Sequence, residues 1–344
     1  MTFLIHPPSS YGSALVAILR EIADATGRVM QTWEKGARDS EAVFPMSIFT
    51  CEDPRDVPVS GTGQRLFILP TTDLFCSWTM DKFGITAAEG IRFASRWRST
   101  AIDIAASTPA NGIALFRPDP RDAHPVATCA QLLDLTADDA SLEDYESRFL
   151  RSLAPDTWDS DAAVLAVGGA HMQAIDAYDP GLIGAPLRLV WPRTMFNAGD
   201  APQEICPATV DLTGRSRILL FGPYFSIPSG FWRVSAFFVA DQNAEGAAIR
   251  LEMNFDGQII ASDIESVAAG AFAATFSFQL DSAGVADFRV WSLRPRLSGA
   301  LNFAGLCLER LGTDENSSRE AGPLPDVFFD SGRRLDRAER KRRG

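Results

Sequence analysis

Side chains suited to ligand chemistry recur in the last third of the chain, where aromatic residues and arginines lie close together. The candidates are Tyr224, Trp232, Arg233, Trp291, Arg294 and Arg296. Flat aromatic faces pack against the C–H side of a sugar ring, and planar guanidinium groups donate hydrogen bonds to hydroxyl or carboxylate oxygens. These residue types therefore suit carbohydrate binding. Because alternation in a strand turns half of such side chains inward, a core position is the alternative, and we favour it for Trp232.

The segment that carries these candidates reads as a series of strands. Apolar alternation is broken every eight to twelve residues by Gly, Pro, Asn or Asp, which is the pattern of an all-β sandwich. The predicted strands span residues 208–212, 217–221, 232–239, 249–255, 258–264, 272–280, 287–291 and 301–309. Eight strands in about a hundred residues suit a jelly-roll-like sandwich. Tyr224 then follows a Gly-Pro turn at its rim, and Arg294 and Arg296 lie in an exposed loop.

The first 155 residues alternate short apolar runs with amphipathic ones. Strands are expected at 2–6, 43–49, 66–69 and 112–116, and a long helix follows the capping box formed by Thr86 and Glu89. This order predicts an α/β domain with a mostly parallel sheet, whose sites form at the carboxyl ends of the strands. The loops after His6, Phe49 and Leu69 and the loop after Phe116 should therefore lie near one another.

The first of these loops joins a strand to a helix, an arrangement in which helix amides can hold a phosphate. It contains one glycine and no cation, so an ordinary turn is the alternative. His6 lies beside the expected cleft, and Asp73 follows a later strand. Either side chain is a candidate general base.

The order of these pieces over residues 2–150 resembles the P-loop sulfotransferase family. Pro8-Ser9-Ser10-Tyr11-Gly12-Ser13 occupies the place of the family's opening loop, and two stretches, 52–60 and 69–77, compete for its 3′-phosphate motif. The resemblance implies 3′-phosphoadenosine-5′-phosphosulfate as the donor. It implies donor-binding roles for Ser9, Ser10, Gly12, Ser13, Ser77 and Arg117. The loop cation is replaced by Ser9 and the phosphate-binding arginine by Glu52 or Leu69, so an inactive domain without a cofactor is expected.

The later segment has its own resemblance. Gly222-Pro223-Tyr224, Pro228-x-Gly230-x-Trp232-Arg233-Val234 and Phe288-Arg289-Val290-Trp291 are similar to a β-sandwich appended to bacterial glycosyltransferases. That resemblance implies carbohydrate binding. We therefore divide the chain into an α/β domain at 1–155, a connector at 156–206, a sandwich at 207–312 and a linker with a basic tail at 313–344.

Composition narrows the partners and the location. The net charge of −12 argues against nucleic acid as a partner, although residues 333–344 carry seven basic side chains against two acidic ones. Five scattered cysteines suggest neither a disulfide framework nor a zinc site. The chain has no long apolar run and no signal-peptide pattern in residues 1–30, so synthesis in the cytoplasm is expected. The basic tail, with Phe328 and Phe329 before it, is a candidate contact for a protein partner.

Three functions remain open at this point. The leading hypothesis is a protein that binds a bacterial capsular or surface polysaccharide, either in the cytoplasm or as an adhesin on a phage-like particle. The first alternative is an active sulfotransferase that modifies a saccharide. The second is a structural subunit of an assembly, held by the sandwich and the Phe328-Phe329 segment.

Overall fold

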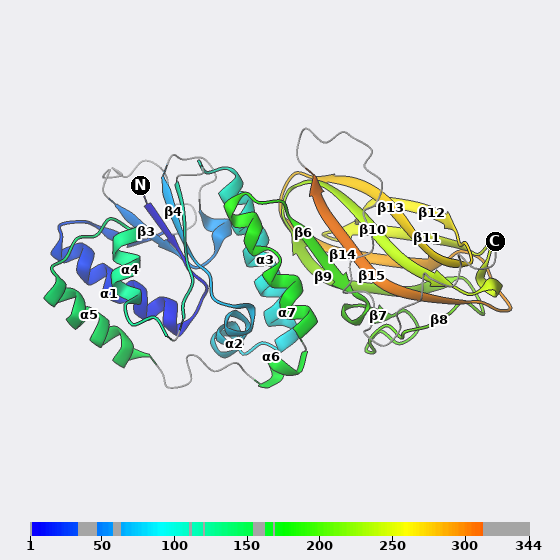
Figure 1. Cartoon of the computed structure of the whole chain (residues 1–344), viewed down its shortest axis with the longest axis horizontal. Coiled ribbons are helices and arrows are strands. Elements are labelled where there is room, and N and C mark those ends of the chain that lie inside the picture. Colours follow the sequence, from blue (N-terminus) through cyan, green and yellow to red (C-terminus); the bar gives the residue numbers. More distant parts are fainter. Residues whose placement is uncertain are drawn as a thin grey trace, which may run out of the picture. The chain divides into compact units, whose positions relative to one another are not determined.

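The computed structural model describes residues 2–33, 47–57, 63–109, 112–119, 121–153, 162–167 and 169–311. The chain forms two compact units (Figure 1). The first consists of Met1–Leu187 with Phe225–Ser229 and Asp281–Gly284, and the second of Arg188–Tyr224, Gly230–Leu280 and Val285–Gly344. The predicted connector is thus shared between them, because its residues up to 187 belong to the first unit. Phe328, Phe329 and the basic tail lie outside the described residues.

The first unit contains a parallel five-stranded sheet in the order β2-β3-β1-β4-β5. The strands are β1 (Thr2–Ile5), β2 (Met30–Thr32), β3 (Ile48–Cys51), β4 (Gln64–Ile68) and β5 (Ile113–Phe116). Every residue of the central strand β1 is buried, which explains why three of its four residues are apolar. Because all five strands are parallel, the loops that follow them lie at one edge. The predicted α/β class and the predicted gathering of these loops are confirmed.

Seven helices of this unit are described. They are α1 (Ser10–Ala25), α2 (Thr72–Phe83), α3 (Ala87–Ala106), α4 (Pro125–Leu132), α5 (Asp139–Ser152), α6 (Ala162–Val167) and α7 (Gly169–Asp176), followed by a short 3-10 helix, η3 (Asp179–Ile183). The predicted capping box opens α3, since Thr86 accepts from the Glu89 amide while Glu89 reaches back to the Thr86 amide. No described helix is long and apolar enough to cross a membrane.

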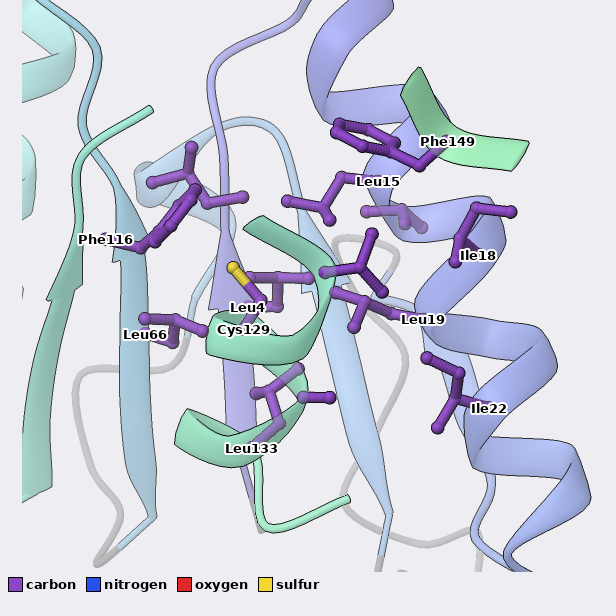
Figure 2. Close-up of a cluster of buried hydrophobic side chains, with 14 of the residues drawn as sticks. Leu4, Leu15, Ile18, Leu19, Ile22, Leu66, Phe116, Cys129, Leu133 and Phe149 are labelled. Carbon is purple, nitrogen blue, oxygen red and sulfur yellow. The ribbon is translucent and has the colours of Figure 1, made fainter. Parts of the chain in front are cut away.

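One core cluster of the first unit lies between the sheet and the helices α1, α4 and α5. Figure 2 shows Leu4 and Leu66 of the sheet facing Leu19 of α1 and Leu133, which directly follows α4. Phe149 of α5 closes the cluster, and all of these side chains are buried. This contiguous apolar packing holds the helices against the sheet and stabilises the unit.

The second unit contains two five-stranded sheets. One has the order β13-β10-β15-β6, with β8 also paired to β15, and the other has the order β12-β11-β14-β9-β7. The strands are β6 (Arg188–Pro192), β7 (Asn197–Ala198), β8 (Val210–Asp211), β9 (Arg217–Ile227), β10 (Gly230–Ala240), β11 (Ala248–Phe255), β12 (Gln258–Ser266), β13 (Gly270–Leu280), β14 (Gly284–Ser292) and β15 (Ala300–Leu311). The recorded pairings within both sheets are antiparallel.

The two sheets pack face to face through aromatic rings. Phe288 of β14 lies 6.1 Å from Phe303 of β15 and 6.4 Å from Phe276 of β13, measured between ring centroids. These contacts join the second sheet to the first, so the predicted β-sandwich is confirmed. Its finer description as a jelly roll stays a prediction.

Candidate functional site

One face of the second sheet of the sandwich is lined by polar and aromatic side chains. In β11 and β14, apolar residues such as Leu251 and Val290 are fully buried, and the residues between them point to the opposite side. Register places Arg250 opposite Trp291, Glu252 opposite Arg289, and Asn254 opposite Asp287. The edge strand β12 adds Ile264, Ser262 and Ile259 to these three rows. We call these nine residues the polar face.

Glu252 is the centre of the first set of contacts on the polar face. The indole Nε1 of Trp291 donates a hydrogen bond to its Oε2 over 2.7 Å. The Nε of Arg250 lies 2.7 Å from its Oε1, and the guanidinium carbon of Arg250 lies 5.2 Å from the centroid of the Trp291 ring. These contacts fix the polar edge of the indole against a buried carboxylate, while Trp291 as a whole remains only half-buried.

Asp287 forms a second charged pair on the same face. Its Oδ2 accepts a hydrogen bond from the Nε of Arg289 over 2.7 Å. Burial raises the pKa of Asp287, Arg289 opposes that rise, and the nearby negative charge of Glu252 adds to it. The charge of Glu252 therefore lies close enough to influence the ionisation of Asp287, and each carboxylate is held beside a guanidinium.

Asn254 has an unused hydrogen-bonding group. Its side chain is only 2% exposed, and its Nδ2 has no hydrogen-bond partner among the described residues. A buried donor without a partner costs about 1–3 kcal/mol, so such a group in a folded protein calls for an explanation. The Nδ2 is shielded from solvent, so a ligand oxygen on the polar face would supply the missing acceptor only after neighbouring side chains move aside.

Exposed apolar side chains flank these polar groups. Ile259 is 58% exposed and Ile264 is 61% exposed. With strands about 4.8 Å apart and about 3.3 Å of rise per residue, three strands and three rows cover roughly 10 by 14 Å. Among the described residues, no group of three or more His, Cys, Asp or Glu side chains is placed to hold a metal ion. The face combines apolar contact with fixed donors and acceptors.

Of the six residues proposed from the sequence for glycan binding, Trp291 lies on the polar face. Trp232 is fully buried, and Arg233 is on the other sheet, where its Nη2 lies 2.8 Å from Glu309 Oε2. Tyr224 lies in β9 with a φ of 66°, its ring 6.2 Å from that of Phe221. Trp232 therefore occupies the core position that we favoured for it from the sequence.

The two loop arginines differ from each other in what they contact. Arg294 is exposed, as expected for a loop residue. The Nη2 of Arg296 donates to the backbone carbonyls of Asn243 and Glu245 over 2.7 and 3.2 Å. Arg296 therefore ties its own loop to a neighbouring turn. Sequence reasoning missed Arg250, Glu252, Asn254, Asp287 and Arg289, although the alternation of polar and apolar residues in β11 was visible.

The first loop of the α/β unit is closely packed. The Oγ of Ser9 accepts from the Gly12 amide over 2.9 Å, and His6 Nδ1 lies 3.0 Å from the Pro7 carbonyl oxygen. Burial lowers the pKa of His6, which is 4% exposed. A Cβ on Gly12 would lie 2.5 Å from His6 Nδ1, so the backbone there is in direct contact with the histidine. Ser10 and Ser13, in the first turn of α1, are exposed.

The remaining candidates of this unit lie after β4 and β5. Asp73 is half-buried in the first turn of α2, and the Ser77 hydroxyl donates to its backbone carbonyl over 2.9 Å. Arg117 Nη1 donates to Asp179 Oδ2 over 2.8 Å, and the Nε of the fully buried Arg98 donates to the other oxygen over 3.0 Å. The donor-binding roles, the choice between 52–60 and 69–77, and the sulfotransferase likeness stay predictions.

Comparison with solved structures finds carbohydrate-binding modules among the similar chains. One is TmCBM61 in complex with β-1,4-galactotriose, with 15% identity, a TM-score of 0.24, and coverage of 30% of this chain and 69% of that one. Another is the CBM36-1 domain of a multidomain xylanase from the hindgut metagenome of Trinervitermes trinervoides, with 6% identity, a TM-score of 0.25, and coverage of 36% of this chain and 98% of that one. A third is the xylan-binding module CBM15, with 11% identity, a TM-score of 0.27, and coverage of 37% of this chain and 97% of that one.

At these TM-scores the likeness carries no argument of its own, and the sandwich is established here by its strand pairing and ring contacts. No protein-family model matches the sequence, and no curated protein matches it.

Proposed function

We propose that the second unit binds a carbohydrate through the polar face. The observation that carries this proposal is that the half-buried Trp291 and the buried Asn254 amide, which has no partner among the described residues, lie on the same face of the sheet, two rows apart. The other side of that sheet faces the sandwich core. An aromatic ring offers a surface for the C–H side of a sugar, and sugar hydroxyls can accept from the amide.

Several features of the face support a carbohydrate over a purely apolar ligand. The face brings guanidinium donors and carboxylate acceptors together in two ion pairs, Arg250–Glu252 and Arg289–Asp287. The pairing holds these groups in place before a ligand binds. Fixed polar groups around an aromatic side chain are the usual composition of a site for a small polar ligand. The estimated size of the face suits a short oligosaccharide. Bacterial surface polysaccharide is the source of such sugars that we propose first.

Calorimetric titration with β-1,4-galactotriose, xylotriose and fragments of bacterial surface polysaccharide tests the proposal. Trp291→Ala should weaken binding by at least about tenfold, which corresponds to about 1.4 kcal/mol. The matched control is Phe231→Ala, because Phe231 is an aromatic residue that is 38% exposed on the other sheet. The Phe231→Ala variant should bind each sugar with the same affinity as the wild type. Equal affinity of the Trp291 and Phe231 variants for every bound sugar would overturn the proposal.

A further inference from the structure

We infer that the polar face selects neutral glycans and discriminates against acidic ones such as uronate-containing oligosaccharides. This inference rests on the proposed function and names the ligand class of the same site. It follows from how the charges of the face are already paired, together with the charge of the unit around them.

Each guanidinium of the face is matched by a carboxylate of its own strand. Arg250 Nε lies 2.7 Å from Glu252 Oε1, and Arg289 Nε lies 2.7 Å from Asp287 Oδ2. The arginine side chains are 35% and 30% exposed, whereas the carboxylate side chains are 3% and 5% exposed. The carboxylates are therefore the fixed partners, and the face has no net charge with which to attract an anion.

The rest of the unit provides no surplus of positive charge. Its described residues, 188–224, 230–280 and 285–311, contain ten arginines, no lysine and no histidine, against eleven acidic residues. Two arginines away from the face are paired with acids of their own: Arg217 Nε lies 2.7 Å from Asp200, and Arg233 Nη2 lies 2.8 Å from Glu309. The described residues of the unit therefore provide no long-range attraction for a uronate.

An acidic sugar would meet repulsion at the face itself. To reach either guanidinium, its carboxylate must come close to Glu252 or Asp287, which are buried and cannot turn away into solvent. Like charges brought together where water is scarce raise the free energy of the complex. A neutral sugar avoids this cost, because its hydroxyls carry no charge and can accept from the partly exposed guanidinium groups.

The apolar border of the polar face contributes to the binding of a sugar ring. Ile264 lies in the same row as Arg250 and Trp291, and it is 61% exposed. Together with the half-buried indole, it provides apolar contact for the C–H surface of a sugar ring. Such contact does not depend on the charge of the ligand, so it favours neutral and acidic sugars alike. Selection therefore comes from the paired charges.

The test compares β-1,4-galactotriose with trigalacturonic acid by calorimetric titration of the full chain at neutral pH and low salt. We expect the neutral trisaccharide to bind at least tenfold more tightly. Glu252→Gln removes the carboxylate that neutralises Arg250, so it should narrow this preference by strengthening binding of the uronate. The matched control is Glu309→Gln, since Glu309 also pairs with arginines, Arg188 and Arg233, but on the other sheet. It should leave the preference unchanged.

The outcomes separate the inference from the proposed function. Equal or tighter binding of the uronate, abolished by Trp291→Ala, would overturn the inference and leave carbohydrate binding at the face intact. An unchanged preference in Glu252→Gln, with the variant folded as judged by its melting, would also overturn it. If neither trisaccharide nor any other neutral or acidic fragment binds, the proposed function fails and the inference fails with it.

Discussion

The carboxyl edge of the parallel sheet and the polar face of the sandwich both gather charged side chains, yet they use them differently. At the sheet edge, the fully buried Arg98 reaches from α3 to Asp179 in η3 and to the carbonyl of Pro70 after β4. Those partners are far apart in the sequence, so the contacts hold segments of the fold together. On the polar face, each ion pair joins two residues of the same strand: Arg250 and Glu252 in β11, and Arg289 and Asp287 in β14.

This difference suggests how to separate structural polar groups from groups available to a ligand. The sandwich does not depend on the polar face for its closure, because its sheets are joined by rings such as Phe288 and Phe303 on the opposite side. The face nevertheless holds an amide that has no partner among the described residues, in Asn254. Polar groups that tie distant segments should therefore affect stability most, and those on the face should affect binding most.

The largest expected effect comes from removing Arg98. Arg98→Leu would leave Asp179, which is 9% exposed, without its buried partner. Breaking a buried pair on one side costs about 3–5 kcal/mol. For a unit of this size the melting midpoint should fall by about 6–20 °C, at roughly 2–4 °C per kcal/mol. Differential scanning calorimetry of the full chain measures the shift.

The control for Arg98 is Arg117, which pairs with the same carboxylate. Its side chain is 55% exposed, so Arg117→Gln should cost no more than about 1 kcal/mol. Glycan binding should be unchanged in both variants. A drop in midpoint of the same size for Arg117→Gln would show that burial is not what makes the edge structural.

A smaller effect is expected where the first loop packs on His6. Gly12→Ala places a Cβ 2.5 Å from His6 Nδ1 and 3.0 Å from the Pro7 carbonyl oxygen, so the buried histidine must shift. Overpacking of this kind typically costs about 1–3 kcal/mol, read from the shift in melting midpoint. Gly169→Ala is the control, because it opens helix α7 and has open space around it. It should be neutral or stabilising. Equal midpoints for the two variants would contradict the close packing.

The sequence was most informative where structure depends on neighbours in the chain. The capping box at Thr86 and Glu89 marked the start of α3, because both partners lie within one turn. Strand β6 was missed and its residues were placed in a connector. Its pairing partner β15 lies more than a hundred residues later, so no local pattern could reveal that 188–192 completes a sheet.

The candidate site shows the same limit. Trp291 could be chosen from its residue type, and the alternation in β11 would have allowed Arg250, Glu252 and Asn254 to be grouped on one side of a strand, although we did not draw that inference. Which residues face Trp291 depends on the register between β11 and β14, and a slip of one residue would move the whole set to the other face. Register is a tertiary property. The site could therefore be assembled only from the structure.

A test in which stability and binding move in opposite directions is available at Asn254. Asn254→Leu replaces a buried donor that lacks a partner by an apolar side chain of similar size. We expect the unfolding free energy to rise by about 1 kcal/mol, because the desolvation cost disappears. Glycan affinity should fall by about tenfold through the loss of a hydrogen bond. Denaturant unfolding and calorimetric titration measure the two quantities.

Asn302, exposed on β15, provides the control for that substitution. Asn302→Leu should change stability by no more than about 0.5 kcal/mol and leave binding unaltered. If Asn254→Leu destabilises the sandwich, the amide is structural, and the comparison between the two regions fails at its most informative residue.

The smallest effect concerns the pH dependence contributed by Asp287. Burial raises the pKa of this carboxyl in the folded state, with Glu252 adding to the rise and Arg289 opposing it. The folded protein therefore takes up the proton at a higher pH than the unfolded chain, in which Asp titrates near about 3.9. As the pH falls from neutral through the raised pKa, this group adds to the unfolding free energy, and the gain is complete below the unfolded value.

Asp287→Asn removes that contribution. The variant should have a higher unfolding free energy than the wild type at neutral pH, and this difference should shrink as the pH falls. Asp211→Asn should show the opposite trend, because hydrogen bonds from Thr213 lower the pKa of Asp211. Its carboxyl favours the fold above the unfolded pKa, and that contribution is lost as the pH falls through the folded value. Denaturant midpoints measured from pH 7 to pH 3 distinguish the two. Parallel curves for both variants would mean that the face does not bury Asp287 strongly enough to distinguish it from an ordinary surface carboxylate.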